Sequence, residues 1–267
     1  MFGYTFDVAK RGCDEMDFMQ RDKKYREKSE IVVSIRSLPK ITKKEFKQLI
    51  VLSKDKNSLV RGDVAKILLE KQVKNRASKK LLYCLARDKD ELVRIDAYEG
   101  LQMFEIPEVE LFLKRAIQTE KEELACWYAI ISWVKAVLSL HDDHTYDINY
   151  IKWLLKQRKI QESEYCLLEC YYTLYQFGEL DIFPILLRFS ESSDYIMHYV
   201  VFCILQDMVN EDNRERVIKA IEKVLENTYS MGLVKDALPY WKELIVEHTQ
   251  AMMRRQAVSG DDSGEEK

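Results

Sequence analysis

The stretch that decides the fold reads DKNSLVRGD at Asp55–Asp63 and returns as DKDELVRID at Asp88–Asp96, 33 residues later. Leucines around this stretch recur at the same spacing: Leu49 and Leu52 match Leu82 and Leu85, and Leu68 matches Leu101. A period of this length is typical of stacked helix pairs, because one pair cannot bury its apolar face alone. The sequence therefore predicts a helical-repeat architecture.

The composition favours an all-α chain. Hydrophobic residues make up 47% of the 267 residues, enough for a large core, while glycine (8) and proline (4) are scarce. Sheet proteins need many turns, so this scarcity favours helices joined by short polar links. No run reaches about 18 apolar residues, and Met1–Asp7 lacks a basic segment before an apolar one. We therefore expect neither a membrane span nor a secretory signal.

The six cysteines show no metal or redox motif, because none forms a C-x-x-C pair. Their expected role is that of small core residues in a reducing cytoplasm. They are Cys13, Cys84, Cys126, Cys166, Cys170 and Cys203.

The net charge of −3 conceals an asymmetry along the chain. Residues 1–80 carry 21 Lys and Arg against 11 Asp and Glu, whereas residues 81–267 carry 21 against 34. Between 160 and 212, ten acidic residues accompany a single basic one, Arg188. Such asymmetry usually reflects solvated helix faces, but it can also steer different partners to the two ends of a molecule.

We expect three parts: an N-terminal helical cap in residues 1–40, where no repeat is visible, a solenoid in 41–249, and a disordered acidic tail in 250–267. The solenoid should hold five to six antiparallel helix pairs. Their expected bounds are 42–53 with 58–71, 76–87 with 91–104, 107–119 with 121–139, 148–159 with 162–177, 179–190 with 194–209, and 212–228 with 232–249.

Helix boundaries are indicated by residues that satisfy free backbone groups. The signals are a capping box at Thr42 and Glu45, N-caps at Asp90, Asp147 and Ser193, a first turn at Pro107, and a helix end at Gly178.

On these residues the chain resembles the HEAT-repeat family. The resemblance rests on Asp88, Val93, Arg94, Ala97 and Leu101, with Asp55, Val60, Arg61 and Leu68 one repeat earlier. The family has an aspartate in the turn between the two helices and Val-Arg at the start of the second. The resemblance implies a right-handed α-α superhelix whose second helices line a concave face. It also suits Pro184 inside a first helix, which is often bent in the family. Later pairs lack Val-Arg, so we expect the Asp–Arg ladder only in the first two.

The repeated charges have two interpretations. Arg61, Asp63, Arg94 and Asp96 can bond neighbouring repeats and satisfy helix ends, or they can contact a ligand. The structural interpretation is favoured.

No catalytic signature is present. Phosphate-binding glycine loops and nucleophile elbows are absent, so we expect a non-enzymatic protein with no catalytic residue and no cofactor. The cluster His141-Asp142-Asp143-His144 has metal-ligand chemistry, but a solvated link between helix pairs is the favoured interpretation, and no metal site is predicted.

Residues beside the core positions of the second helices form the candidate partner-binding groove. Aromatic anchors among carboxylates are typical of protein-binding faces, although the tyrosines could equally fill space between repeats. Trp133 is expected in the core. The predicted groove residues are Asp63, Asp96, Tyr98, Tyr128, Glu164, Glu169 and Tyr171.

The sequence thus predicts a cytoplasmic scaffold that binds a protein or peptide, with a basic partner favoured by the acidic groove. The alternative is a nucleic-acid-binding or DNA-repair protein similar to the HEAT-like alkylpurine glycosylases. Those enzymes use Trp and Asp in a basic pocket, whereas none of the four tryptophans here precedes an acidic residue by four positions. The acidic stretch also repels phosphate, so nucleic acid is disfavoured.

Overall fold

The computed structural model describes residues 23–210 and 212–226. Throughout these ranges the regular structure is helical and contains no strand, which confirms the all-α class for the described part of the chain. None of the helices described is both long and apolar enough to cross a membrane. The described residues fall into two compact units, 23–179 and 180–226.

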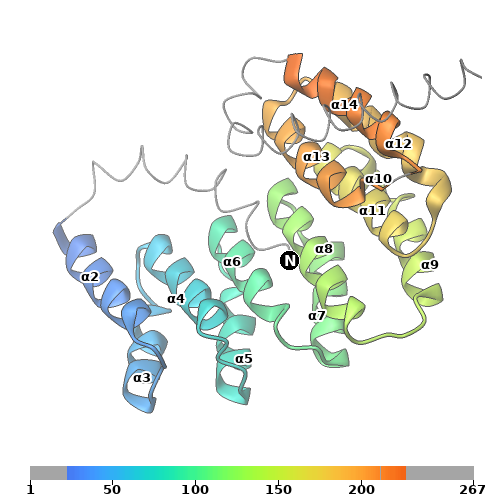
Figure 1. Ribbon diagram of the computed structural model, residues 1–267. Coiled ribbons are helices and arrows are strands. Elements are labelled where there is room, and N and C mark those ends of the chain that lie inside the picture. Colours follow the sequence, from blue (N-terminus) through green and yellow to red (C-terminus); the bar gives the residue numbers. More distant parts are fainter. Residues whose placement is uncertain (1–22, 211, 227–267) are drawn as a thin grey trace, which may run out of the picture. The chain divides into compact units, whose positions relative to one another are not determined.

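The first unit contains ten helices in its described part, coloured blue to yellow-green in Figure 1. They are α2 (Lys23–Ser37), α3 (Lys43–Leu52), α4 (Ser58–Glu70), α5 (Arg76–Leu85), α6 (Glu91–Leu101), α7 (Pro107–Thr119), α8 (Glu123–Leu138), α9 (Thr145–Leu154), α10 (Arg158–Gln161) and α11 (Glu164–Gln176). The first three predicted pairs are confirmed as α3/α4, α5/α6 and α7/α8. The fourth differs, because the segment predicted as 148–159 ends at Leu154 and a short α10 precedes α11.

Capping residues set most of these bounds. Thr42 accepts the Lys44 amide and its own amide donates to Glu45, which confirms the capping box. Asp90 accepts the Leu92 amide at 3.1 Å, and Gly178 adopts the left-handed conformation just after α11, with φ of 93°. Pro107 lies in the first turn of α7, as predicted.

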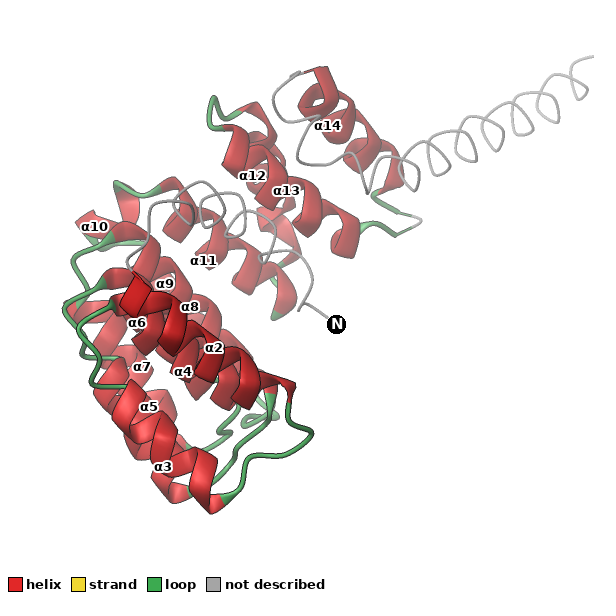
Figure 2. Cartoon of the chain, turned by 90° about the vertical axis from the view of Figure 1, so that its left-hand side faces the viewer, coloured by secondary structure: helices red, strands yellow, loops and turns green. Residues whose placement is uncertain are grey.

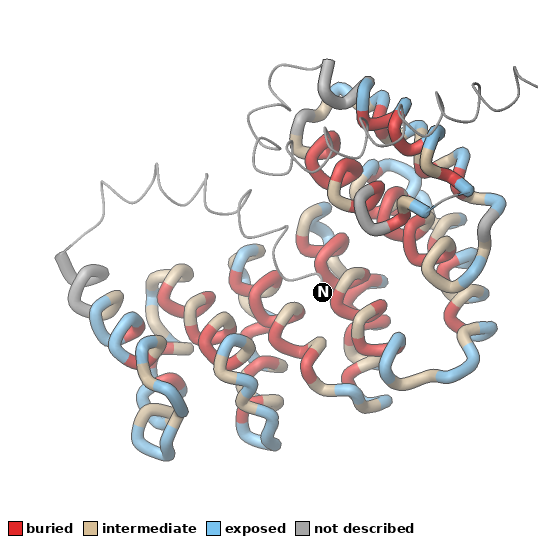
Figure 3. Tube along the Cα trace, viewed as in Figure 1, coloured by how far each residue is buried: buried red, intermediate tan, exposed pale blue. Residues whose placement is uncertain are grey.

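The second helices of the pairs form one continuous layer. Contacts join α2 to α4, α4 to α6, α6 to α8 and α8 to α11, and Figure 2 shows α2, α4, α6 and α8 near one another. Buried residues concentrate on the second helices α4, α6 and α8, whereas the first helices α3 and α5 are more exposed (Figure 3). The core therefore lies between neighbouring second helices and between each of them and the first helix of its pair.

Close approach in this layer depends on small residues. A Cβ at Gly100 would lie 2.6 Å from Leu82 Cδ2, and one at Gly62 would lie 2.5 Å from Asp96 Oδ2. Ala65 and Ala97 are fully buried in α4 and α6. Such residues let neighbouring helix axes come close.

The repeated arginines form equivalent ion pairs. Arg61 places Nε and Nη2 2.7 Å from the two carboxylate oxygens of Asp88, and Arg94 does the same with Glu120 at 2.8 Å. In both cases Nη1 also donates to two backbone carbonyls of the preceding turn, which for Arg94 include that of Asp88. These contacts confirm the structural interpretation of both arginines, and glutamate replaces aspartate in the second.

An earlier copy of this ion pair is present at α2. Lys28 lies 33 residues before Arg61 and its ammonium pairs with Asp55, as Arg61 pairs with Asp88. Helix α2 thus takes the place of a second helix in a preceding repeat, although no repeat is visible in the sequence of residues 1–40. We call the pairs Lys28–Asp55, Arg61–Asp88 and Arg94–Glu120 the ion-pair rungs.

The second unit contains η2 (Leu180–Ile182), α12 (Phe183–Arg188), η3 (Phe189–Glu191), α13 (Tyr195–Met208) and α14 (Arg214–Glu226). The predicted helix 179–190 is interrupted. Pro184 lies at the start of α12 and not inside a bent helix, because proline has no amide to donate within a helix. The predicted N-cap at Ser193 is wrong: Asp194 caps α13 by accepting the Ile196 amide at 2.8 Å.

Other predictions lie outside the described residues. They concern the first part of the cap in 1–22, the helix 232–249 and the tail 250–267. The predicted core position is confirmed for Cys126, Cys166 and Cys170, which are buried, whereas Cys203 is half-buried and Cys84 is exposed. Cys13 lies outside the described residues.

Candidate functional site

The predicted groove residues differ in exposure. Glu164 is exposed and Asp63 and Tyr171 are half-buried, whereas the other four are buried: Asp96, Tyr98, Tyr128 and Glu169. The reason is geometric. Each of α6 and α8 is contacted by a second helix on both sides and by its own first helix, so the positions beside the buried Ala97 and Ala129 are covered.

Tyr98 and Tyr128 are buried and contact neighbouring side chains. The Tyr98 hydroxyl donates to Glu120 Oε2 at 3.0 Å, beside the Arg94 guanidinium. Burial and the neighbouring Glu120 carboxylate raise the pKa of Tyr98 well above its ordinary value. Tyr128 meets Trp127 edge-on, with ring centroids 5.4 Å apart.

The acidic residues on α4 and α6 have cations beside them. Arg36 Nη2 donates to Asp63 Oδ1 at 3.3 Å, and Lys66 Nζ lies 3.8 Å from Asp96 Oδ2. Burial raises the pKa of the Asp63 carboxyl despite Arg36 and Lys66. Attraction for a basic partner is reduced at these two carboxylates, because each has a cation of its own.

Glu169 is a buried carboxyl of α11. The Trp127 indole donates to its Oε2 at 3.3 Å. Burial raises the pKa of Glu169 to about 7, against the opposing effects of the Trp127 hydrogen bond and of Lys135. Burial also lowers the pKa of Lys135, against the opposing effects of the Glu99 and Glu169 charges. This carboxyl is therefore a component of the core and not of an open face.

Exposed aromatic residues occur instead on α9. Tyr146, Tyr150 and Trp153 follow one another at helical spacing, and Tyr146 and Trp153 are 67% and 42% exposed. Tyr150 and Trp153 stack with centroids 5.6 Å apart. Tyr150 in turn meets buried Trp133 edge-on at 5.0 Å, and Trp133 lies in the core as predicted. We call these three α9 residues the aromatic strip.

A lysine of α7, Lys114, lies against the aromatic rings of the strip. Lys114 Nζ lies 4.4 Å from the ring centroid of Tyr146, 4.9 Å from that of Tyr150 and 5.3 Å from that of Trp133. The same ammonium is 2.5 Å from Glu110 Oε1. A buried lysine needs both a counter-charge and electron-rich neighbours, and the strip supplies the second.

The two histidines of the α8–α9 link meet at one carboxylate. His141 Nδ1 and His144 Nδ1 lie 2.8 Å and 3.1 Å from Asp147 Oδ2. The Nδ1 atom of each imidazole therefore faces the same carboxylate oxygen. Asp147 is fully buried in the first turn of α9 and does not cap it, so its predicted role as N-cap is wrong.

Further contacts fix both imidazoles. His141 Nε2 lies 3.5 Å from Glu110 Oε2, and the His144 ring stacks on Phe177 at 4.3 Å with an interplanar angle of 9°. The cluster therefore ties the beginning of α9 to α7 and to the C-terminal end of α11.

In the described residues the hydrogen bonds of both imidazoles go to carboxylates, and neither reaches a serine, threonine or cysteine. Over the same residues, no group of three or more His, Cys, Asp or Glu side chains is arranged to hold a metal ion. The exposed feature of this region is the aromatic strip.

Sequence reasoning missed the strip, although a signal was available. Tyr146, Tyr150 and Trp153 are spaced by four and three residues, which places them on one helix face. The predicted groove was drawn from second helices alone, and α9 is a first helix.

The chain matches no family model, no curated protein and no solved structure.

Proposed function

We propose that the chain is a non-enzymatic scaffold built as a HEAT-like solenoid, and that it binds a protein or peptide through the aromatic strip of α9. One observation carries the proposal: two large aromatic side chains, Tyr146 and Trp153, are exposed on a helix whose other contacts hold them in place. The solenoid arrangement is supported by the 33-residue recurrence of the ion-pair rungs and by the continuous layer of second helices.

Tyrosine and tryptophan are the residues that dominate binding energy at protein interfaces. Both combine a large apolar surface with a polar tip, which suits a surface that is wet before binding and dry afterwards. Here the rings are also restrained, because Tyr150 stacks on Trp153 and Lys114 lies under Tyr146. A restrained side chain loses little conformational entropy on binding, so more of its contact energy is available for affinity.

The partner should be basic near the strip. Asp142 and Asp143 are exposed in the link immediately before α9, and residues 81–267 carry 34 acidic against 21 basic side chains. An arginine or lysine of the partner could meet these carboxylates and also lie over an exposed ring of the strip. The four buried groove residues act inside the protein in this proposal.

The test compares partner capture by matched variants. We expect Tyr146→Ala combined with Trp153→Ala to lose proteins that the parent chain retains, as measured by quantitative mass spectrometry of purified complexes. Val51→Ala is the control, because Val51 is a 72% exposed apolar residue on α3, away from the strip. Retention should also weaken with salt, since screening shortens the Debye length from about 10 Å at 0.1 M to about 3 Å at 1 M.

Two results would contradict the proposal. One is retention of the same proteins by the strip variant and by the parent. The other is equal loss in the strip variant and in Val51→Ala, which would indicate general adhesion to apolar surface. Release of bound nucleic acid from the parent chain would favour the alternative of a nucleic-acid-binding protein.

A further inference from the structure

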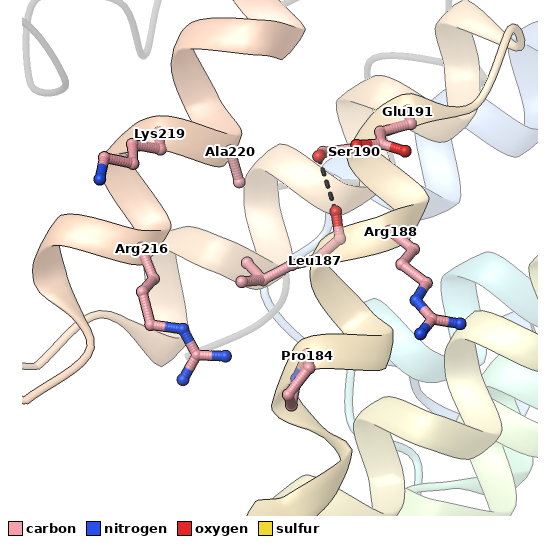
Figure 4. A pocket seen from close by; sticks show the side chains of 8 residues that line it. All are labelled: Pro184, Leu187, Arg188, Ser190, Glu191, Arg216, Lys219 and Ala220. Atoms are coloured by element: carbon pink, nitrogen blue, oxygen red, sulfur yellow. Dashed lines mark hydrogen bonds between the residues drawn. The ribbon is translucent and has the colours of Figure 1, made fainter.

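A cavity of about 320 Å³ opens on the second unit, between α12 with η3 on one side and α14 on the other. Figure 4 shows Leu187 and Ala220 between the two elements, with Arg216 and Lys219 on the α14 side and Arg188 on the α12 side. Pro184, Ser190 and Glu191 complete the lining. The Ser190 hydroxyl donates to the Leu187 carbonyl at 2.7 Å, so the polar group in the floor is satisfied.

Three cations are among the residues that line this cavity, and two of them form no ion pair with any residue that the structure describes. In the described part of the chain, no carboxylate pairs with Arg188 or Arg216, whereas Lys219 lies 2.8 Å from Glu215. Arg188 is also the single basic residue among ten acidic ones between 160 and 212. The guanidinium of Arg216 lies 4.7 Å from the ring centroid of Phe183, which holds it at the rim.

The positive charges beside the cavity favour an anionic ligand. The exposure of the lining residues indicates how large that ligand is. Sites for small molecules bury most of the ligand surface. Here Pro184, Arg188, Glu191, Arg216 and Lys219 are all exposed, so a small molecule would remain largely in water. A protein segment can cover the open side itself while one side chain enters the cavity.

We propose that this cavity, named here the α12–α14 pocket, binds an acidic protein segment that inserts one aliphatic side chain. The aliphatic group contacts Pro184, Leu187 and Ala220, and carboxylates on both sides of it pair with Arg188 and Arg216. A nucleic acid fits less well, because Glu191 lines the cavity, Glu215 already pairs with Lys219, and no aromatic ring lines the floor for base stacking. This inference concerns the second unit and does not rest on the aromatic strip.

The test uses the full chain and a defined probe, a fluorescein-labelled acetyl-Glu-Asp-Leu-Glu-Asp peptide, with binding followed by fluorescence anisotropy. We expect measurable binding at or below about 1 mM that weakens with salt. Replacing the leucine of the probe by serine should weaken binding by at least about fivefold, because the apolar contact is lost.

Matched variants locate the site. Arg188→Glu should weaken binding by about tenfold, since it removes one attraction and adds a repulsion. Arg158→Glu makes the same change of net charge at an 89% exposed side chain of α10 in the first unit, and it should leave binding unchanged. Both arginines are on the surface, so both variants should fold, which circular dichroism checks. Arg188→Gln provides a second variant without charge reversal and should give a smaller loss.

Several outcomes would overturn the inference. They are absence of binding up to about 1 mM, equal affinity for the leucine and serine probes, and equal losses in Arg188→Glu and Arg158→Glu. Displacement of the probe by a single-stranded oligonucleotide that binds more tightly, with the same dependence on Arg188, would assign the pocket to phosphate instead.

Discussion

Replacing Glu169 by glutamine should stabilise the protein, and the gain should depend on pH. Glutamine keeps an oxygen that can accept the Trp127 indole N–H, but it carries no charge to bury. Burial raises the pKa of Glu169 from an ordinary 4.5 to about 7, which corresponds to about 3 kcal/mol of cost for the ionised form.

The sign follows from proton binding. Between pH 4.5 and 7 the folded state keeps a proton on Glu169 that the unfolded state has lost, so the parent chain loses stability as pH rises through this window. Glutamine has no such proton to lose. The advantage of Glu169→Gln should therefore be near zero at about pH 4.5 and approach about 3 kcal/mol at pH 8.

The assay is urea unfolding at several pH values between 5 and 8, followed by the fluorescence of Trp127, Trp133 and Trp153 in the first unit. Glu164→Gln is the matched control, because it makes the same substitution at an exposed carboxylate of the same helix. Parallel stability curves for Glu169→Gln and the parent would refute the reasoning. A loss of stability at pH 8 would also refute it. Such a loss would show that the attraction between Lys135 and ionised Glu169 outweighs the cost of burying the Glu169 charge.

Three further substitutions test the helix layer. Val93→Asp should lower the free energy of unfolding by several kcal/mol, because Val93 is 1% exposed and the new carboxylate has no partner. An unchanged melting temperature would show that the role of α6 is misassigned. Gly100→Ala should destabilise by about 1–3 kcal/mol in chemical denaturation despite the better helix propensity of alanine, because the new Cβ lies 2.6 Å from Leu82 Cδ2; a gain in stability would mean that Leu82 moves aside freely. Arg94→Lys should cost about 1–3 kcal/mol, since lysine cannot make both bonds to Glu120 and also reach the turn carbonyls. A double-mutant cycle with Glu120→Gln measures that coupling, and additive effects would contradict it.

Features encoded within one repeat period could be predicted from the sequence. The caps at Thr42 and Asp90, Pro107 in the first turn of α7 and the end at Gly178 each depend on a residue and its immediate neighbours. The pairing of Arg61 and Arg94 followed from the recurrence itself. Lys28 was missed because lysine replaces arginine there and the Leu-Val that precedes Arg61 is absent.

Burial between helices could not be predicted in the same way. Glu169 and Asp96 were expected beside a groove, but whether such a position faces water depends on how closely the neighbouring second helices approach. Asp147 shows the same limit: its spacing suits an N-cap, yet two histidines from the preceding link turn it inward. In both cases a carboxylate that looks solvated in the sequence is enclosed by contacts from other segments.

The spacing of the ion-pair rungs determines how the chain can be lengthened by duplication. Arg61 and its partner Asp88 are 27 residues apart, so each rung joins the beginning of one second helix to the turn of the next repeat. If residues 62–94 were duplicated in tandem, the first copy of Arg94 would stand 27 residues before the second copy of Asp88, and every arginine would again find a carboxylate at its usual distance along the chain. Chain length could thus change by a whole 33-residue module without any new kind of junction. The Arg94 rung spans 26 residues instead of 27, and its carboxylate belongs to glutamate, whose side chain is one carbon longer than that of aspartate.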